Sequence, residues 1–365
     1  MILSVGLLSV LAFRVLLFLP PLAEAYATTV NPVVLQVVSL ITGILPISLA
    51  ELVVIGYPAV LVVLSLRGIL STVRGRRRWR NLLGGGALRV TRDAGFVLFV
   101  FYASWGFNYA RPPLRLRLGW AEFTTPPVDT LAALAELAVT RANEAYVLLH
   151  GSTDAGTPTQ LTGSMNELAN KLELGWIAAQ QQLGLPRSVR RNYGNPKKLL
   201  LTPIVARFGI AGFFFPWTAE ANVLRDSPAV SRVSSMAHEM AHQRGTGPEA
   251  EANFLGFVAG INSPDQLANY SAWVFAQVQL LAVLRAEDHD RGEVIATQRY
   301  AGIVRDLDDL GDYWDRYRGA LRRVGRGVND RFLRANRVSG GIANYGMSVR
   351  LIITFMEEHS PTQDS

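Results

Sequence analysis

Hydrophobic and polar residues alternate very differently in the first 110 residues and in the rest of the chain. Three long apolar runs lie in the first part, at residues 2–19, 49–66 and 94–109. A helix needs about 20 mostly apolar residues to cross a bilayer. The pattern therefore predicts a membrane anchor of about three transmembrane helices in residues 1–110.

Two of these runs leave alternatives open. The first run contains Arg14, which is unusual within a span. Its other interpretation is a signal peptide cut near residues 23–25. The lack of a basic stretch before the apolar run argues against that interpretation. Residues 33–66 are too long for one helix and too short for two spans. Because Pro46 divides them, we interpret residues 34–45 as an interfacial or re-entrant piece.

Positive charge is concentrated between the second and third predicted spans. The chain carries a net charge of +7, and residues 67–92 hold eight arginines and no acid, so the remainder is close to neutral. Such clusters mark cytoplasmic loops. We therefore expect a multi-pass protein of the cell membrane whose residues 111–365 lie outside the cytoplasm. No nucleic-acid-binding motif accompanies the arginines, so we expect no nucleic-acid partner.

Residues 111–365 show mainly helical periodicity. Short apolar stretches at 199–205 and 210–215, with an edge strand at 221–224, predict a small sheet. The expected fold class is mainly α with a small β-sheet, a zincin-like α+β domain preceded by the transmembrane helices. The predicted helices are residues 127–150, 164–183, 266–287, 294–310, 313–324 and 344–358.

The chemistry of the chain is concentrated in the motif HExxH at residues 238–242. His238 and His242 are one helical turn apart, so their imidazoles share a face and can bind one Zn²⁺. Glu239 can then take a proton from a zinc-bound water as a general base. Chance occurrence is the alternative, with two ordinary histidines. The chain has five histidines in all and no cysteine, which excludes thiolate zinc ligands and cysteine nucleophiles.

A catalytic zinc site needs a third protein ligand. The longer motif HExxHxxGxxH is excluded, because Pro248 stands where its third histidine would be. Glu249 and Glu251 remain, at the start of a second predicted helix. We favour Glu251, which lies farther inside that helix, with Asn253 as a residue that orients a ligand. Both glutamates could instead serve the helix dipole.

The segments around this motif resemble the DUF3810 family, a group of membrane-anchored proteins thought to be zinc metallopeptidases of the gluzincin type. The similarity covers almost the whole chain. Trp217 replaces the usual phenylalanine and Asn344 the usual serine, and neither is a proposed ligand. The similar segments are residues 45–52 (LPISLAEL), 105–111 (WGFNYAR), 215–223 (FPWTAEANV), 238–255 and 339–346.

An enzyme of this type also needs a group that stabilises the oxyanion formed during the reaction. Tyr345, in a glycine-rich turn, is the first candidate, and Tyr193 and Arg244 are weaker ones. Glu220 and Asn222 are expected to line the cleft. Ordinary packing is the alternative for each of these residues.

Together these features predict a membrane-bound, zinc-dependent metallopeptidase with a peptide or protein substrate. One alternative is a non-catalytic binding or assembly protein with a structural or vestigial metal site. Another is a zinc amidase acting on cell-wall material. The intact Glu239 favours an enzyme, because a structural zinc site needs no general base.

Overall fold

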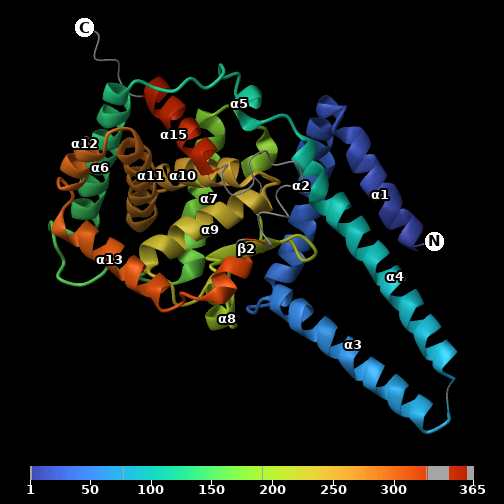
Figure 1. Ribbon diagram of the computed structural model, residues 1–365. Coiled ribbons are helices and arrows are strands. Elements are labelled where there is room, and N and C mark those ends of the chain that lie inside the picture. The colour runs from blue at the N-terminus through green and yellow to red at the C-terminus, as the bar shows by residue number, and fades with distance from the viewer. Residues whose placement is uncertain (1, 77, 191, 326, 328–344, 360–365) are drawn as a thin grey trace.

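The computed structural model describes residues 2–76, 78–190, 192–325, 327 and 345–359. It is mainly helical, with one three-stranded sheet and four apolar N-terminal helices. In Figure 1 helix α3 and the first half of helix α4 extend away from the other elements, and the end of α3 approaches the start of α4. The N-terminal helices are α1 (Ile2–Leu16), α2 (Pro20–Gly43), α3 (Leu49–Val73) and α4 (Trp79–Ser104).

Helices α2, α3 and α11 (Gln266–Glu287) are long and apolar enough to cross a membrane, which indicates a membrane protein. Most of α11 is buried within the protein, however, so its apolar character is that of a core helix. Helix α3 is largely exposed along its length. An apolar helix that the protein itself leaves uncovered is suited to contact with lipid.

The structure changes the boundaries predicted for this region. Residues 34–45, expected as a separate re-entrant piece, are mostly the second half of the continuous helix α2. Polar residues interrupt the apolar pattern of α2 because one of its faces packs on the rest of the protein. Residues 94–109 were expected as a span, but α4 begins at Trp79 and ends at Ser104, followed by the 3-10 helix η1 (Gly106–Ala110). Much of the arginine-rich stretch is therefore helical.

Helix α1 packs closely along the second half of α4 (Figure 1). The contact is tightest at two glycines: a Cβ atom added to Gly6 would lie 2.4 Å from the carbonyl oxygen of Gly95. Small residues allow helix backbones to approach in this way, as is common between membrane helices.

The sheet has the order β1-β3-β2, with β1 (Lys197–Leu199) parallel and β2 (Gly212–Phe215) antiparallel to β3 (Glu220–Leu224). The prediction that residues 221–224 form an edge strand is wrong, because β3 is the central strand and is fully buried. Residues 202–205, expected in a strand, begin the helix α8 (Thr202–Arg207). Strand β2 is the edge that faces the candidate site.

Helices α6, α7, α9, α10, α11 and α15 enclose the main hydrophobic core, which includes the fully buried Trp176, Tyr146 and Phe254. The predicted helices 127–150, 164–183 and 266–287 are confirmed. The predicted helix 294–310 is interrupted between α12 and α13. The remaining elements are α5 (Leu114–Arg117), α6 (Val128–His150), α7 (Met165–Gln182), η2 (Arg187–Arg190), α9 (Ala229–Gln243), α10 (Glu249–Ile261), α12 (His289–Ala296), α13 (Ala301–Asp315) and α15 (Tyr345–His359).

Candidate metal centre

The HExxH motif forms the last turns of α9, as its sequence predicts. The helix begins after Pro228 and ends at Gln243, and the chain then turns at Gly245, whose φ is +82°. A left-handed conformation of this kind favours glycine. The turn brings the start of α10 back beside the last turn of α9 and so places a second helix next to both histidines.

Each histidine of the motif is oriented through its Nδ1 atom. Nδ1 of His242 lies 2.7 Å from the backbone carbonyl oxygen of Thr246, and Nδ1 of His238 lies 2.7 Å from Oδ1 of Asn253. A carbonyl oxygen can only accept, so Nδ1 must carry the hydrogen in both contacts. Nε2 is therefore the nitrogen left to bind a cation, and the two Nε2 atoms face each other at 3.0 Å.

Glu249 completes this group of electron-pair donors. Its Oε2 lies 3.1 Å from Nε2 of His238 and 3.6 Å from Nε2 of His242. In a tetrahedral zinc site, bonds of about 2.0–2.1 Å place two ligand atoms roughly 3.3 Å apart. The observed separations, 3.0 to 3.6 Å, fit that value. Two imidazoles and one carboxylate are also a ligand set that zinc uses in catalytic sites.

Glu251, which the sequence analysis favoured as the third ligand, lies elsewhere. Its two oxygens accept hydrogen bonds from the backbone N–H of Leu114 and from the guanidinium of Arg117, both at 2.7 Å. The reason is helical geometry: two residues correspond to about 200° around a helix, so Glu249 and Glu251 point to opposite sides. Asn253 is four residues after Glu249 and shares its face, which is why both meet His238.

Glu239 lies beside the three potential ligands His238, His242 and Glu249. The potential ligand atoms of His238, Glu239 and His242 all lie within 4.8 Å of one another. Glu239 is buried, it faces strand β2, and its Oε2 has no hydrogen-bond partner among the described residues. A buried carboxylate oxygen without a partner is costly, so it implies an interaction with a group that enters the site, such as water or substrate.

The electrostatics of the cluster favour a positive charge among its donors. Burial lowers the pKa of His242, but the charge and hydrogen bond of Glu249 outweigh it and raise that pKa to about 9. Burial raises the pKa of Glu249, yet the two histidines hold it well below its usual range. For Glu239, burial dominates and raises the pKa to about 7 despite the nearby histidines. A cation bound to His238, His242 and Glu249 would supply this positive charge in place of a proton.

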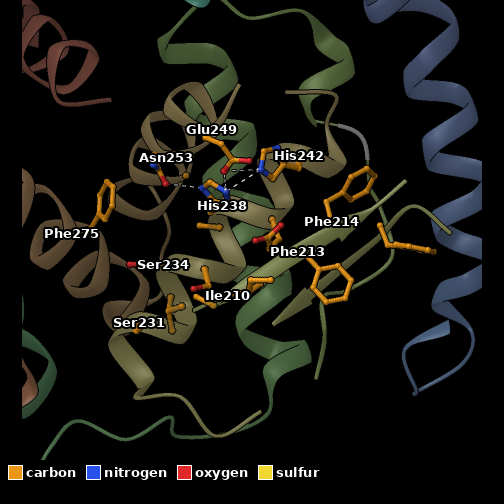
Figure 2. Close-up of a pocket in the computed structure, with 18 of the residues that line it drawn as sticks. Ile210, Phe213, Phe214, Ser231, Ser234, His238, His242, Glu249, Asn253 and Phe275 are labelled. Carbon is orange, nitrogen blue, oxygen red and sulfur yellow. Dashed lines mark hydrogen bonds and ion pairs between the residues drawn. The ribbon is translucent and has the colours of Figure 1, made fainter. Parts of the chain in front are cut away.

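A cavity of about 870 Å³ lies over the cluster. Figure 2 shows its two sides. Phe213 and Phe214 of strand β2, with Ile210 just before it, lie on one side, and Phe275 of α11 lies opposite. Ser231 and Ser234 of α9 lie below the histidines along the same face of the helix. The cavity thus exposes both the potential metal ligands and Glu239 to a substrate.

Four other residues singled out in the sequence, Tyr193, Arg244, Glu220 and Asn222, do not line this cavity. Tyr193 and Arg244 are buried against each other, with the guanidinium 5.1 Å from the tyrosine ring, and Arg244 also pairs with Glu173. Glu220 is paired with Lys197 and accepts hydrogen bonds from the backbone at the start of α3, so it fastens that helix to the sheet. Asn222 is buried within the sheet. The side chain of Tyr345 lies outside the described residues.

Two aromatic residues next to the site were not predicted as part of it. The indole of Trp105, at the C-terminal end of α4, stands edge-on against the imidazole of His242, with ring centroids 5.5 Å apart. It also contacts Phe214 of β2, at 4.8 Å between centroids. Residues 105–111 belong to the segments that resemble the family, but the sequence does not indicate that they form a wall of the site. The folded structure shows this position.

The fold and the site together define a class: a helical membrane protein with a small sheet, in which an HExxH helix lies beneath a cavity. The chain belongs to the DUF3810 family, whose profile matches residues 26–353 and is described as a protein of unknown function. The predicted family is therefore confirmed. No curated protein and no solved structure matches the chain significantly.

Proposed function

We propose that this protein is a membrane-bound, zinc-dependent peptidase in which Glu239 is the general base. The observation that supports it most is the convergence of two Nε2 atoms and the Glu249 carboxylate beside the unpartnered Oε2 of Glu239. A structural zinc site would not need a buried carboxylate next to its ligands with one oxygen left unpartnered among the described residues. A non-catalytic protein accounts less well for this arrangement.

Three side chains would hold the metal: His238, His242 and Glu249. A zinc ion bound there would acidify a water molecule and polarise the carbonyl group of a substrate. Asn253 and the carbonyl of Thr246 fix the imidazole planes, so the ligands are oriented before any metal binds. Such orientation keeps the two Nε2 atoms directed at one point.

Glu239 would move the proton during the reaction. Its free Oε2 takes a proton from the attacking water as the new C–O bond forms at the carbonyl carbon. The same oxygen then passes the proton to the amide nitrogen as the C–N bond breaks. One carboxylate can perform both steps because the first leaves it protonated, which makes it the acid that the second step needs.

Strand β2 favours a peptide as the substrate over other amides. Among the described residues it pairs with a strand on one side only, β3, and its residues Gly212 to Phe215 line the cavity. The backbone of an edge strand can pair with an extended peptide. A peptide bound along β2 would pass directly over Glu239, because the Glu239 carboxylate lies within 3 Å of a Cβ atom added to Gly212.

For the orientation in the membrane, we propose that the arginine-rich turn between α3 and α4 is cytoplasmic and the metal centre extracytoplasmic. The turn and the metal centre are separated by the length of α3 and α4 (Figure 1). Polar side chains of α2 instead contact protein groups: the buried Ser39 accepts hydrogen bonds from Gln243 and from the backbone N–H of Gly194 in the folded domain, and the buried Asn31 donates to the carbonyl oxygen of Ser104 at the end of α4. Helix α2 therefore belongs to the extracytoplasmic unit in this arrangement.

The decisive experiment compares the wild-type chain with Glu239→Gln. The amide keeps the shape of the side chain but cannot act as a base. We expect unchanged zinc content and folding, and a loss of turnover of about two to four orders of magnitude. Turnover is measured on a mixed peptide library with the purified full-length protein, by mass spectrometry of the products. Near-wild-type cleavage by Glu239→Gln, or no zinc in the folded wild-type protein, would refute the proposal.

A further inference from the structure

The cavity over the metal centre has one wall that comes from the membrane anchor. Phe101 and Trp105 of α4, and Tyr109 of η1, line it together with the residues of β2. Helix α4 also carries exposed apolar side chains before this wall, and one of them, Val97, lies one helical turn before Phe101 on the same face. The site and the apolar surface of α4 are therefore continuous along a single helix.

The loop between β2 and β3 joins the cavity to the same helix. Nε1 of Trp217 donates a hydrogen bond to the carbonyl oxygen of Val97 at 3.3 Å, and its ring lies 5.9 Å from that of Phe101. Phe215 packs on Trp217 in turn, with centroids 4.9 Å apart. Tryptophan is favoured where apolar and polar surroundings meet, at the surface of a bilayer. This loop therefore sits where the folded domain would meet the lipid.

The walls of the cavity carry little charge. Apart from the histidines, the charged side chains among the described lining residues are Glu239, Glu249 and Arg322. Aromatic side chains dominate the side facing α4, and burying an apolar group against them is favourable in proportion to the area removed from water. A bulky apolar residue next to the scissile bond would gain this free energy, whereas a charged residue would lose its hydration without a partner.

We propose that the substrates are polypeptides anchored in the same membrane, cleaved close to the bilayer beside a bulky apolar residue that binds between Phe101, Trp217 and Phe214. This rests on the proposed peptidase function and names its substrate class. A segment leaving the bilayer along α4 reaches the cavity without crossing water. The loop with Trp217 then separates lipid from the reacting peptide.

The test uses the full-length protein in vesicles of phosphatidylethanolamine and phosphatidylglycerol. The probes are two sets of synthetic peptides with the same variable segment, one followed by a transmembrane leucine–alanine helix and one without it. In each set, one position holds leucine, phenylalanine, serine or asparagine. We expect faster cleavage of anchored peptides, and a preference of about tenfold or more for the apolar residues.

Sharing a bilayer raises the effective concentration of any anchored peptide, so the rate advantage alone does not identify the binding wall. The deciding comparison is between Phe101→Ala, which removes a lining side chain, and Phe99→Ala, which removes an exposed one on the same helix. We expect Phe101→Ala to lower the preference for apolar residues severalfold while Phe99→Ala leaves it unchanged. Trp217→Ala should act like Phe101→Ala, with the zinc content of each variant measured alongside.

The outcomes separate this inference from the function on which it rests. Cleavage of both peptide sets at the same rate, abolished by Glu239→Gln, would leave a peptidase but overturn the membrane-bound substrate. An apolar preference unchanged in both Phe101→Ala and Trp217→Ala would also overturn it. If the zinc-loaded protein cleaves neither set, the proposed function itself fails.

Discussion

The side-chain amide of Gln243 donates a hydrogen bond to the hydroxyl of Ser39 at 2.8 Å, which joins the residue after the HExxH motif to helix α2. The same amide donates to the carbonyl oxygens of Gly194 and Ala219. Gln243 therefore connects the HExxH helix to the N-terminal helices, to a loop and to the turn between β2 and β3. The candidate metal centre is assembled at this junction and does not belong to the C-terminal part alone.

A first prediction concerns the fragment 111–365, which lacks α1 to α4. It leaves donors on Gln243, Arg111 and Lys197 without their acceptors on Ser39, Glu24 and Thr42. Each unsatisfied buried group costs about 1–3 kcal/mol, against a typical stability of roughly 5–15 kcal/mol. We expect this fragment to bind zinc substoichiometrically or to unfold, as measured by atomic absorption and circular dichroism.

The matched control is the fragment 20–365 in detergent, which lacks only α1 and keeps all three of these contacts. It should bind one zinc per chain. A stable 111–365 fragment with full zinc content would show that α2 does not support the site.

A second prediction separates the two glutamates of α10. Glu249→Ala removes a carboxylate that lies 3.1 Å from Nε2 of His238, so it should weaken zinc binding by more than 100-fold, beyond the usual effect of outer residues. Glu251→Ala should retain zinc but lower the free energy of unfolding, because it leaves the buried Arg117 without its partner. Competition with a chelating dye and thermal unfolding measure the two effects. The reverse pattern of zinc affinities would return the ligand role to Glu251.

A third prediction concerns Asn253, which orients His238 through a contact of 2.7 Å. Asn253→Ala leaves all three ligands in place but releases the imidazole plane. We expect zinc affinity to fall by about 10- to 100-fold, the usual effect of removing a residue that orients a ligand. The partly buried Asn269 donates to the backbone carbonyl of Ile261, at the end of α10 remote from the histidines, so Asn269→Ala serves as the control. Equal affinities for the two variants would contradict the role of Asn253.

Much of this arrangement could be predicted from the sequence, and the reasons for the failures are physical. Spacing alone placed His238 and His242 on one face of a helix that ends near Gly245. Depth in the helix favours Glu251, but direction around the helix axis determines which glutamate lies beside His238, and that residue is Glu249. The four-residue spacing of Glu249 and Asn253 was the available signal.

The contribution of the N-terminal helices could not be predicted in the same way. Asn31 and Ser39 interrupt an apolar pattern, and periodicity does not show whether such residues face water, another helix or a metal-binding domain. Trp105 reaches His242 only through the end of α4 and the turn into η1. Long-range contacts of this kind depend on the packing of whole elements, which no local pattern records.

The final prediction is the orientation of the chain in the membrane. The chain contains no cysteine, so single cysteines can report the side on which a residue lies without any background. Arg76→Cys lies in the arginine-rich turn after α3, and Ser152→Cys is exposed in the loop after α6. Arginines resist translocation, so the turn should remain cytoplasmic while the folded domain is exported.

In intact cells, a maleimide that does not cross membranes should therefore label Ser152→Cys and leave Arg76→Cys unlabelled. After the cells are opened, both should react, which shows that the two thiols are equally accessible. Labelling of Arg76→Cys but not Ser152→Cys in intact cells would place the metal centre in the cytoplasm. The proposed extracytoplasmic substrates would then be wrong, although the assignment of the metal ligands would stand.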